Sequence, residues 1–565
     1  MKDFILKYEY SQLRFKHKIC LNLIFYEKRD ANMTTILITG AIVVILSVLC
    51  SRFSKKTGIP ILLIFIGLGM LFGSDGLLKI EFSNYKFAGE ICSIALIFIM
   101  FYGGFGTKWS EAKPIATKAI LLSSCGTILT AGLVGAFCHF VLGFKLIEGF
   151  LTGAILSSTD AASVFSVLRT KKLSLKYNTA SLLEVESGSN DPFAYMLTII
   201  LITILKGDFS AGNVIILIFS QIFLAIGIGI VVAILAEIAL KRLNFVSGGF
   251  NTAFVMAVAA FAYSLPELIG SNGYLSTYIV GIILGNRKIP DKKAQVNFFD
   301  GITSLVQVGI FFTLGLLAFP SKLPQVIIPS VLIALVLTFA ARPLAVLAIL
   351  APFRSKWQQM TLVSWAGLRG AASIVFAIIA TVKGQEFLSN DIFHITFFVV
   401  LLSILFQGTL LPFVSKRLNM IDKSTNVLKT FNDYSEENEI QFIRLEIKNG
   451  HSWINNRVKN ISLPPETLLT LIQRGEKSIV PRGNTRIEEN DKVILCAKSC
   501  PNDESVNFKE RTIDKNHKWC GKYISEIKLS DKSIIIMVIR NDRTIIPNGR
   551  FKISCGDVVV INSVE

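Results

Sequence analysis

Long apolar runs alternate with short polar loops over most of this chain, from about residue 34 to residue 415. Runs of about 20 mainly apolar residues are long enough to cross the hydrocarbon core of a bilayer as helices. The pattern predicts thirteen apolar segments, of which the ninth is short, at 34–51, 59–75, 88–105, 115–140, 147–168, 180–205, 212–240, 249–268, 273–286, 301–319, 325–350, 359–382 and 391–415. We therefore expect an α-helical polytopic membrane domain over residues 33–417.

The loops between these segments alternate in charge. One set, the basic loops, is rich in Lys and Arg, whereas the other set, the basic-poor loops, holds almost none. Because basic loops stay on the cytoplasmic side of a membrane, we expect the first set and the C-terminal tail to be cytoplasmic and the second set to be external. The basic loops are 52–56, 108–113, 169–176, 241–242, 287–293, 354–356 and 416–417, and the basic-poor loops are 74–76, 143–145, 206–208, 266–267, 320–322 and 384–386.

Residues 1–32 do not fit this alternation. They hold seven Lys and Arg residues, which would have to lie on the external side. They contain neither a continuous apolar core nor a cleavage site made of small residues, so they do not resemble a secretory signal. We expect residues 1–32 to be a non-native or disordered extension and Met33 to be the natural start.

The composition agrees with a membrane protein. Charged residues make up 17% of the chain and the mean hydropathy is +0.56, whereas a soluble protein carries about 25% charged residues. The basic loops account for the net charge of +18, and no basic-aromatic module predicts a nucleic-acid partner. The nine Cys residues are scattered without a zinc-binding set, so we expect reduced thiols and no resident metal. We also expect no cofactor and no enzymatic activity.

The tail beyond residue 417 is charged, rich in β-forming residues, and duplicated. Residues recur at a spacing of 66 without a gap, as in His451 and His517, Trp453 and Trp519, and many further pairs. Turn residues separate the runs that predict strands, at 467–474, 478–481, 492–497, 533–540, 544–547 and 557–562. The repeat predicts a polar linker at 418–438 and two small α+β domains at 439–500 and 501–565.

The sixth apolar segment contains three acids, Glu184, Glu186 and Asp191. A carboxylate at the bilayer centre costs about 3 kcal/mol or more, so an acid inside a membrane is a candidate functional residue. In a helix, Ser187 and Asp191 share one face, and Glu186 and Asn190 form the adjacent stripe. These side chains predict an oxygen-rich pocket for a small cation or a proton. The alternative is that the first acids, above all Glu184, cap a helix start near the surface.

Two further polar clusters interrupt apolar segments. The first, 157–160, places hydroxyls beside Thr159 and Asp160 in the fifth segment, where hard oxygen ligands suit a dehydrated cation; the alternative is a polar contact between helices. The second, 367–372, contains Arg369, which needs a counter-ion such as Glu186 or Glu184, unless it reaches an interface instead. Arg342 lies near a segment end, where we expect it to extend to the surface.

Together these motifs resemble the NhaP/NHE branch of cation:proton antiporters. Their residue sequences are closest to those of its bacterial potassium/proton members. The resemblance covers about 34–415 and implies a fold of inverted repeats like that of NhaA and NhaP. In that family the Asp of the Asn-Asp pair carries the ion and the proton. Transferred to this sequence, the ion and proton site is Asp191, Asn190, Asp160, Thr159 and Ser187, braced by a pair of Glu186 and Arg369. One departure is Tyr102, which stands where relatives often carry an acid.

The two tail repeats resemble the C-terminal domain of RCK (TrkA-C) regulators. The resemblance rests on an Ile-x-Arg or Ile-Arg strand, an Ile-x-Pro-x-Gly turn and an Asp-x-Val strand in each copy. Such domains dimerise and bind small anionic ligands, and cyclic di-AMP is the ligand that the resemblance suggests. The candidate ligand contacts are Arg474, Arg482, Arg540 and Arg550. The alternative is that these are solvated surface charges of a dimerisation module.

The resemblance implies an electroneutral potassium/proton antiporter, a homodimer in the plasma membrane of a bacterium, with a ligand-sensing cytoplasmic tail. A sodium/proton antiporter of the same fold is the first alternative. A ligand-gated potassium channel with an RCK-type tail is a second, although no segment resembles a filter loop of backbone carbonyls. A membrane anchor for a silent sensor is a third, and the intact polar clusters argue against it.

Overall fold

The computed structural model divides into two compact units, Met1–Tyr434 and Ser435–Glu565. In the first unit the structure describes residues 38, 40–49, 60–77, 79–171, 173–207, 211–242 and 248–422. In the second it describes 440–463, 467–475, 477–498, 507–514, 517–527, 529, 533–540, 543–545 and 547–563. The expectations for residues 1–32 and for most of the linker at 418–438 lie outside the described residues.

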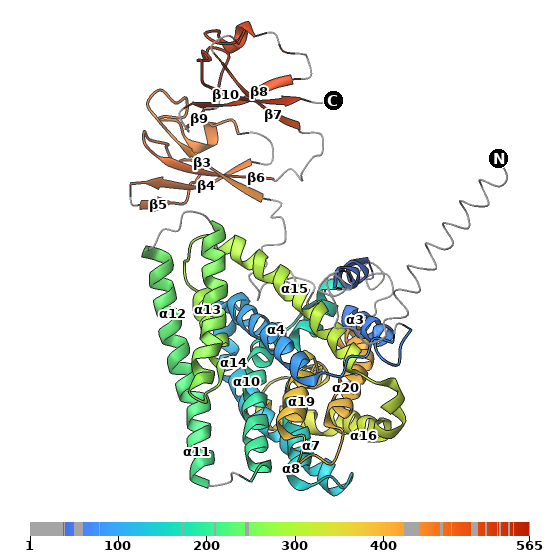
Figure 1. Ribbon diagram of the computed structural model, residues 1–565. Helices are drawn as coiled ribbons and strands as arrows, with labels where there is room; N and C mark the ends of the chain where they lie inside the picture. The colour runs from blue at the N-terminus through green and yellow to red at the C-terminus, as the bar shows by residue number, and fades with distance from the viewer. Residues whose placement is uncertain are drawn as a thin grey trace, which may run out of the picture. The chain divides into compact units, whose positions relative to one another are not determined.

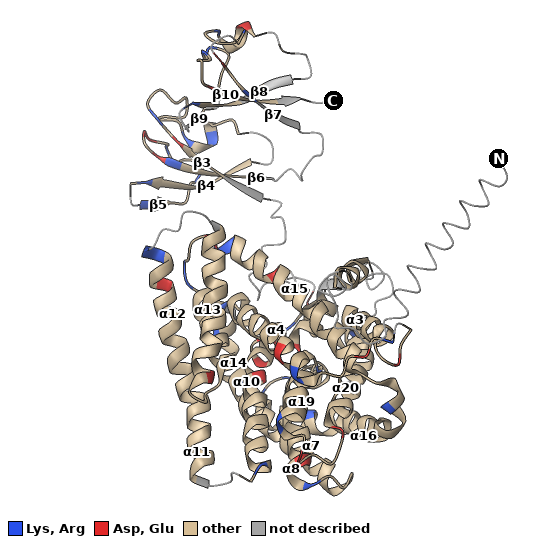
Figure 2. Ribbon diagram, viewed as in Figure 1, with Lys and Arg blue, Asp and Glu red and all other residues tan. Residues whose placement is uncertain are grey.

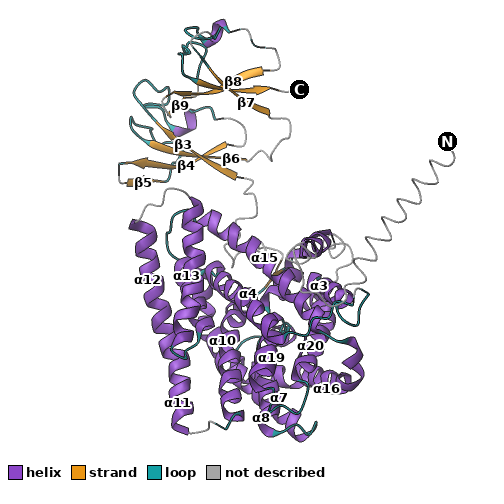
Figure 3. Cartoon of the chain, viewed as in Figure 1, coloured by secondary structure: helices purple, strands orange, loops and turns teal. Residues whose placement is uncertain are grey.

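The first unit is helical (Figure 1, Figure 3). Its helices are α3 (Ile61–Phe72), α4 (Tyr85–Gly106), α5 (Trp109–Ala112), α6 (Ala116–Leu121), α7 (Thr127–Phe140), α8 (Leu146–Ser157), α9 (Ala161–Thr170), α10 (Thr179–Leu205), α11 (Ala211–Phe219), α12 (Ala225–Arg242), α13 (Gly248–Leu268), α14 (Gly273–Gly285), α15 (Lys292–Leu317), α16 (Leu323–Val336), α17 (Arg342–Leu350), α18 (Trp357–Trp365), α19 (Ala371–Gly384), α20 (Ile392–Leu402) and α21 (Thr409–Arg417). Short π-helical segments join α6 to α7, α11 to α12, α16 to α17 and α20 to α21. The strands β1 (Ser174–Leu175) and β2 (Ile421–Asp422) pair antiparallel.

The predicted membrane domain is confirmed as a bundle of apolar helices. Among the described residues, nine helices are long and apolar enough to cross a membrane. Four shorter apolar helices lie at Gly40–Leu49, Ile61–Phe72, Gly273–Gly285 and Ala371–Gly384. Each of them overlaps a segment expected from the apolar pattern, although Lys292–Leu317 begins nine residues before the expected 301–319, and the number of crossings stays a prediction.

Glycines bring some neighbouring helices into close contact. A Cβ atom at Gly104 of α4 would lie 2.4 Å from the Tyr278 carbonyl oxygen of α14, and one at Gly281 would lie 2.4 Å from the Phe101 carbonyl oxygen. Helices in a membrane associate largely through such van der Waals packing, since lipid tails are as apolar as the side chains. The contact fixes α14 against α4 beside the polar residues of α10.

The second unit contains two four-stranded antiparallel sheets. The first has the order β3-β6-β4-β5, from β3 (Ile440–Glu446), β4 (Thr467–Arg474), β5 (Lys477–Ile479) and β6 (Lys492–Lys498). The second has the order β7-β10-β8-β9, from β7 (Asn507–Thr512), β8 (Ser533–Arg540), β9 (Arg543–Ile545) and β10 (Val558–Ser563). The strand register repeats at the 66-residue spacing. Ile472 pairs with Ile479 in the first sheet, and the residues 66 positions later, Val538 and Ile545, pair in the second. The duplication read from the sequence is therefore a duplication of structure, although the sequence reading missed both first strands, β3 and β7.

Arg474 and Arg540 hold corresponding parts of the two sheets together. The Arg474 Nε donates to Asp491 Oδ1 at 2.8 Å, and the Arg540 Nε donates to Asp557 Oδ1 at 2.7 Å. Burial opposes ionisation of each Asp, but the hydrogen bonds from its arginine hold the pKa of that carboxyl below its usual range. Both guanidinium groups are thus engaged by carboxylates of their own domains, while the expectation that these two arginines contact a ligand stays a prediction.

One pair of cysteines departs from the expectation of reduced thiols. Cys520 and Cys555 form a disulfide with a Cα–Cα distance of 5.2 Å, within the range that a disulfide spans. The corresponding positions of the first sheet domain are Ile454 and Glu489, so this bond belongs to the second copy alone. Among the described residues, Cys92, Cys125, Cys138 and Cys496 are free thiols, as expected.

Candidate functional site

Two interrupted helices cross in the interior of the helical unit. α8 ends at Ser157 and α9 begins at Ala161, while α18 ends at Trp365 and α19 begins at Ala371. The Asp160 N–H donates to the Leu368 carbonyl at 2.8 Å, which joins the two interruptions. Non-helical backbone at membrane depth is tolerated only where protein buries it or where it lines a cavity. The crossing therefore marks a site where backbone and side-chain oxygens gather, as in the discontinuous helices of transporters.

Gly370 makes this crossing sterically feasible. A Cβ atom at this position would lie 2.3 Å from Asp160 Oδ2 and 2.4 Å from Asp160 Cβ. Any side chain at residue 370 would displace Asp160. The small residues that follow Arg369 in the sequence thus serve the close approach of the two interruptions.

Helix α10 passes the crossing and presents its polar face to it. The Asn190 amide is bound twice, because its Nδ2 donates to Thr159 Oγ1 at 2.5 Å and its Oδ1 accepts from the Thr159 N–H at 3.3 Å. The Ser187 hydroxyl donates to the Thr159 carbonyl at 2.7 Å and accepts from the Ala161 N–H at 2.8 Å. The structure therefore brings Ser187, Asn190 and Thr159 together, as the sequence predicted.

Asp191 and Asp160 have different environments within this cluster. Asp191 is 6% exposed and accepts a hydrogen bond from the Ser158 hydroxyl. Asp160 accepts from the Ser163 N–H at 3.2 Å and from the Ser163 hydroxyl, and so caps the first turn of α9. A carboxylate that accepts from the first turn of a helix supports the start of that helix. Asp160 therefore serves the start of α9, whereas Asp191 has one hydroxyl donor and faces the cavity.

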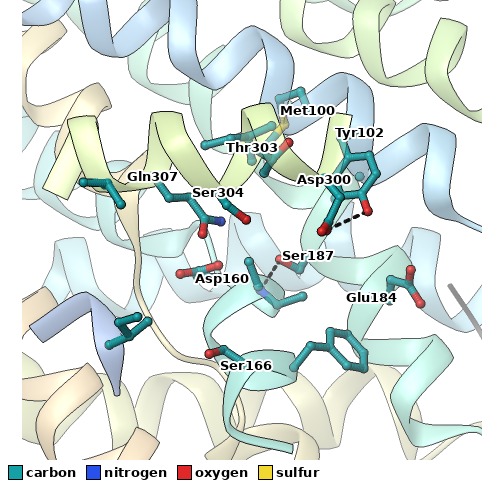
Figure 4. A pocket seen from close by; sticks show the side chains of 18 of the residues that line it. Met100, Tyr102, Asp160, Ser166, Glu184, Ser187, Asp300, Thr303, Ser304 and Gln307 are labelled. Carbon is teal, nitrogen blue, oxygen red and sulfur yellow. Dashed lines mark hydrogen bonds between the residues drawn. The ribbon is translucent and has the colours of Figure 1, made fainter. Parts of the chain in front are cut away.

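A cavity of about 540 Å³ reaches this cluster from one side (Figure 4). Its lining includes Asp160, Ser187 and Asp191, together with residues of α4 and α15. The lining residues of α10 precede or include Asp191, and those of α15 lie in the part that follows the basic loop 287–293. The cavity thus lies between the polar cluster around Asp191 and the helix ends that adjoin the basic loops. We call the side of the bundle with these helix ends the basic side.

Asp300 is a cavity residue that the sequence reading missed. The Tyr102 hydroxyl donates to Asp300 Oδ1 at 2.9 Å (Figure 4). An acid thus stands beside the position where relatives often carry one, but it comes from α15 instead of α4. The missed signal is the polar stripe Asp300, Thr303, Ser304 and Gln307, whose helical spacing places all four on one face. Figure 2 shows further acidic residues inside the helical unit near α10 and α14.

The predicted pair of Glu186 and Arg369 is wrong, because Glu186 pairs with Arg342. The Arg342 Nη2 atom lies 2.6 Å from Glu186 Oε1 and 2.7 Å from Oε2, and both side chains are at most 4% exposed. Glu186 faces α17 across the bundle, and Arg342 reaches it over Gly367, where a Cβ atom would lie 2.9 Å from Arg342 Nε. Arg342 is therefore a buried partner and does not extend to the surface.

Arg369 binds backbone carbonyls at the end of a half-helix. It is the largest fully buried side chain among the described residues. Its Nη1 donates to the Ser157 carbonyl at 2.9 Å and to the Ser158 carbonyl at 2.7 Å, at the C-terminus of α8. A cation there compensates the negative end of the helix dipole and the carbonyls that lack helical partners. Arg369 thus stabilises the interruption that carries Ser158 and Thr159.

Residues 41–417 match the family described as "Sodium/hydrogen exchanger, transmembrane". The chain belongs to this family. The match covers the predicted membrane domain and confirms the resemblance seen in the sequence motifs. Residues 442–499 and 508–562 each match the TrkA-C domain, which confirms the second resemblance.

Several members of the sodium/hydrogen exchanger family are similar over most of this chain. The K(+)/H(+) antiporter NhaP2 of Shewanella baltica is 33% identical over 474 residues, which make up 83% of this chain and 81% of that protein. The K(+)/H(+) antiporter NhaP of Alkalimonas amylolytica is 33% identical, covering 83% of this chain and 82% of that protein. The structure of the sodium proton antiporter MjNhaP1 from Methanocaldococcus jannaschii has a TM-score of 0.60 at 26% identity, covering 68% of this chain and 99% of that one.

Breaking the Glu186–Arg342 pair on one side should destabilise the protein. Arg342→Leu leaves a buried carboxylate without its partner, a change that costs about 3–5 kcal/mol in comparable pairs. We expect Arg342→Leu and Glu186→Leu each to lower the unfolding temperature in detergent, and the double variant to recover part of the loss. Arg417→Leu, at an exposed position near the end of α21, is the matched control. An Arg342→Leu protein as stable as the control would show that the pair contributes nothing.

Proposed function

We propose that this chain exchanges potassium ions for protons across the plasma membrane of a bacterium, with Asp191 as the group that carries both in turn. The observation that supports this most directly is the position of Asp191. It lies almost fully buried at the crossing of two interrupted helices and lines the cavity on the basic side. The basic side is cytoplasmic in this proposal, because the basic loops adjoin it.

The arrangement supports exchange through competition for one carboxylate. A carboxylate in a largely water-excluded place binds either a proton or a cation, since its isolated negative charge is costly there. The Ser158 hydroxyl contacts Asp191, and Thr159 and Asp160 follow Ser158 in the same interruption, so we propose that their oxygens share in holding a cation beside Asp191. Arg369 stays charged in both states because a guanidinium does not deprotonate at accessible pH. One proton therefore leaves when one cation binds.

Potassium is the proposed cation because the relatives that share both the membrane domain and the tail are named K(+)/H(+) antiporters. Those relatives align with 83% of this chain. The Na(+)/H(+) antiporter 1 of Methanocaldococcus jannaschii is 29% identical over 371 residues, or 61% of this chain. The replacement of an acid by Tyr102, bound to Asp300, changes a cavity residue beside the site. Sodium/proton exchange on the same fold is the alternative.

Asp191→Asn should abolish exchange while the protein still folds. An amide of the same shape accepts the Ser158 hydrogen bond but cannot alternate between a proton and a cation. The measurement is potassium-dependent proton flux in proteoliposomes driven by a pH gradient, repeated with sodium and lithium. Glu386→Gln, at an exposed position of a basic-poor loop, serves as the control. Exchange at the wild-type rate in Asp191→Asn would refute the assignment of the carrier.

Exchange should be electroneutral, one cation for one proton. Asn190 does not titrate and Asp160 is held as a helix cap, so Asp191 alone changes its occupant. We expect the exchange rate to stay constant when a membrane potential is imposed at a fixed pH gradient. Valinomycin is unsuitable where potassium is the substrate, so the potential is best set by a lipophilic anion. A rate that follows the imposed potential would contradict the single-carrier stoichiometry.

We propose that the two TrkA-C domains form a cytoplasmic regulatory tail that dimerises and binds a small dianion such as cyclic di-AMP. Because Arg474 and Arg540 already bind carboxylates of their own domains, the exposed Arg482 and Arg550 are the main candidate contacts. Arg482 lies in the turn after β5 of the first copy, and Arg550 lies in the turn after β9 of the second. Ligand binding would act by shifting an existing equilibrium between active and inactive membrane states.

Calorimetry on the purified full-length protein tests the ligand site. We expect cyclic di-AMP to bind the wild type, and the Arg482→Ala, Arg550→Ala double variant to bind at least about tenfold more weakly, since each lost charge-assisted hydrogen bond weakens binding. Lys448→Ala with Lys522→Ala, two exposed tail positions, should behave as the wild type. Equal binding by both double variants would remove Arg482 and Arg550 from the ligand site, and no binding by the wild type would leave the tail as a dimerisation module.

A further inference from the structure

A row of tyrosine side chains leads away from Asp191 towards the side opposite the cavity. We call it the tyrosine ladder, and it consists of Tyr274, Tyr195 and Tyr263, with Glu267 at its end. Tyr278 lies one turn after Tyr274 on the same face of α14 and packs against Gly188, which lines the cavity, so it stands outside the ladder.

The ladder continues through ring contacts to a carboxylate. The ring centroids of Tyr274 and Tyr195 are 4.9 Å apart, and those of Tyr274 and Tyr263 are also 4.9 Å apart. The Tyr195 hydroxyl then donates to Glu267 Oε1 at 3.1 Å. Tyr195 lies one helical turn after Asp191 on the same face of α10, so the ladder begins at the ion site itself.

The direction of the ladder follows from the helices that carry it. α10 runs from the basic loop 169–176 to the basic-poor loop 206–208, and Tyr195 lies beyond Asp191 along it. Glu267 lies in the last turn of α13, beside the basic-poor loop at 266–267. The cavity approaches Asp191 from the basic side. The ladder therefore occupies the other half of the route across the membrane.

The tyrosine side chains of the ladder are buried or partly buried, yet each carries a hydroxyl group that packing alone does not require. Tyr195 and Tyr274 are at most 4% exposed. The Tyr195 hydroxyl donates to Glu267, and the Tyr274 hydroxyl has Ser93 and Tyr263 as its polar neighbours. Burying a hydroxyl costs more than burying the same ring without it unless the hydroxyl is well hydrogen-bonded. A route for ions between Asp191 and Glu267 would give these hydroxyl groups a function.

We propose that the tyrosine ladder is the external half of the ion route, and that Glu267 is the carboxylate that a potassium ion or a proton meets when it enters from the basic-poor side. The inference rests on the proposed exchange function and adds a second binding residue to it. The exposed Lys383, near the end of α19, is the cation that faces Glu267. Asn272, whose Nδ2 donates to the Pro192 carbonyl at 2.9 Å, ties the start of α14 to the turn of α10 after Asp191. Movement of that turn would separate Tyr195 from Tyr274 and open the ladder.

The test measures transport from each side separately. Right-side-out and everted vesicles from the same cells expose the basic-poor and the basic side, respectively, and potassium is varied on the exposed side only. We expect Glu267→Gln to raise the potassium concentration for half-maximal exchange about tenfold or more on the basic-poor side, because a charged ligand becomes neutral. The value on the basic side should stay at the wild-type level. Glu386→Gln, another acid beside a basic-poor loop, should leave both values unchanged.

Two further variants keep the proposal testable if Glu267→Gln does not fold. Tyr195→Phe and Tyr274→Phe retain the ring contacts and remove only the hydroxyls, and each should weaken potassium use on the basic-poor side alone. Wild-type values on both sides in all three variants, or equal changes on both sides, would overturn the proposal while leaving the proposed exchange intact. Absence of exchange by the wild type in either type of vesicle would instead remove the proposed function and this inference with it.

Discussion

The crossing of two interrupted helices is the contact on which the rest of the site depends. A single backbone hydrogen bond, from the Asp160 N–H to the Leu368 carbonyl, joins the interruptions. Four half-helix ends then lie in the interior, and their unpaired carbonyls and N–H groups would be costly there without partners. Arg369 satisfies the end of α8 and Asp160 caps the start of α9. The charges that stabilise the crossing also surround the place where we propose that Asp191 holds an ion.

This arrangement separates the residues that bind from those that support them. Asn190 and Ser187 fasten α10 to the interruption, and the Glu186–Arg342 pair fastens it to α17. Asp191 is left with one hydroxyl donor and the cavity in front of it. A carboxylate held in this way can exchange its occupant without loss of the surrounding contacts. In our proposal, the tyrosine ladder behind it is the other half of an alternating route.

Periodicity and charge in the sequence predicted the helical domain, its segments and the two sheet domains, because each depends on local patterns. The ion cluster was also predicted, since its residues lie in two short runs whose spacing on a helix is fixed. The partner of Glu186 was not, because Arg342 and Arg369 are both buried arginines and only the packing of α17 over Gly367 decides between them. Asp300 and the internal role of Arg474 were missed for the same reason: each depends on a partner distant in the sequence. The first strands β3 and β7 were missed because edge strands are often charged and carry a weak pattern.

The central claim is that one buried carboxylate binds a proton or a cation but never both. Calorimetric titration of the purified protein with potassium, in two buffers of different ionisation enthalpy, counts the protons released for each ion bound. At a pH low enough to protonate the free site, the account predicts close to one proton released per potassium ion, falling as the pH rises, and no coupled release in Asp191→Asn. Potassium binding to the wild type without proton release at every pH at which the protein is folded would contradict it.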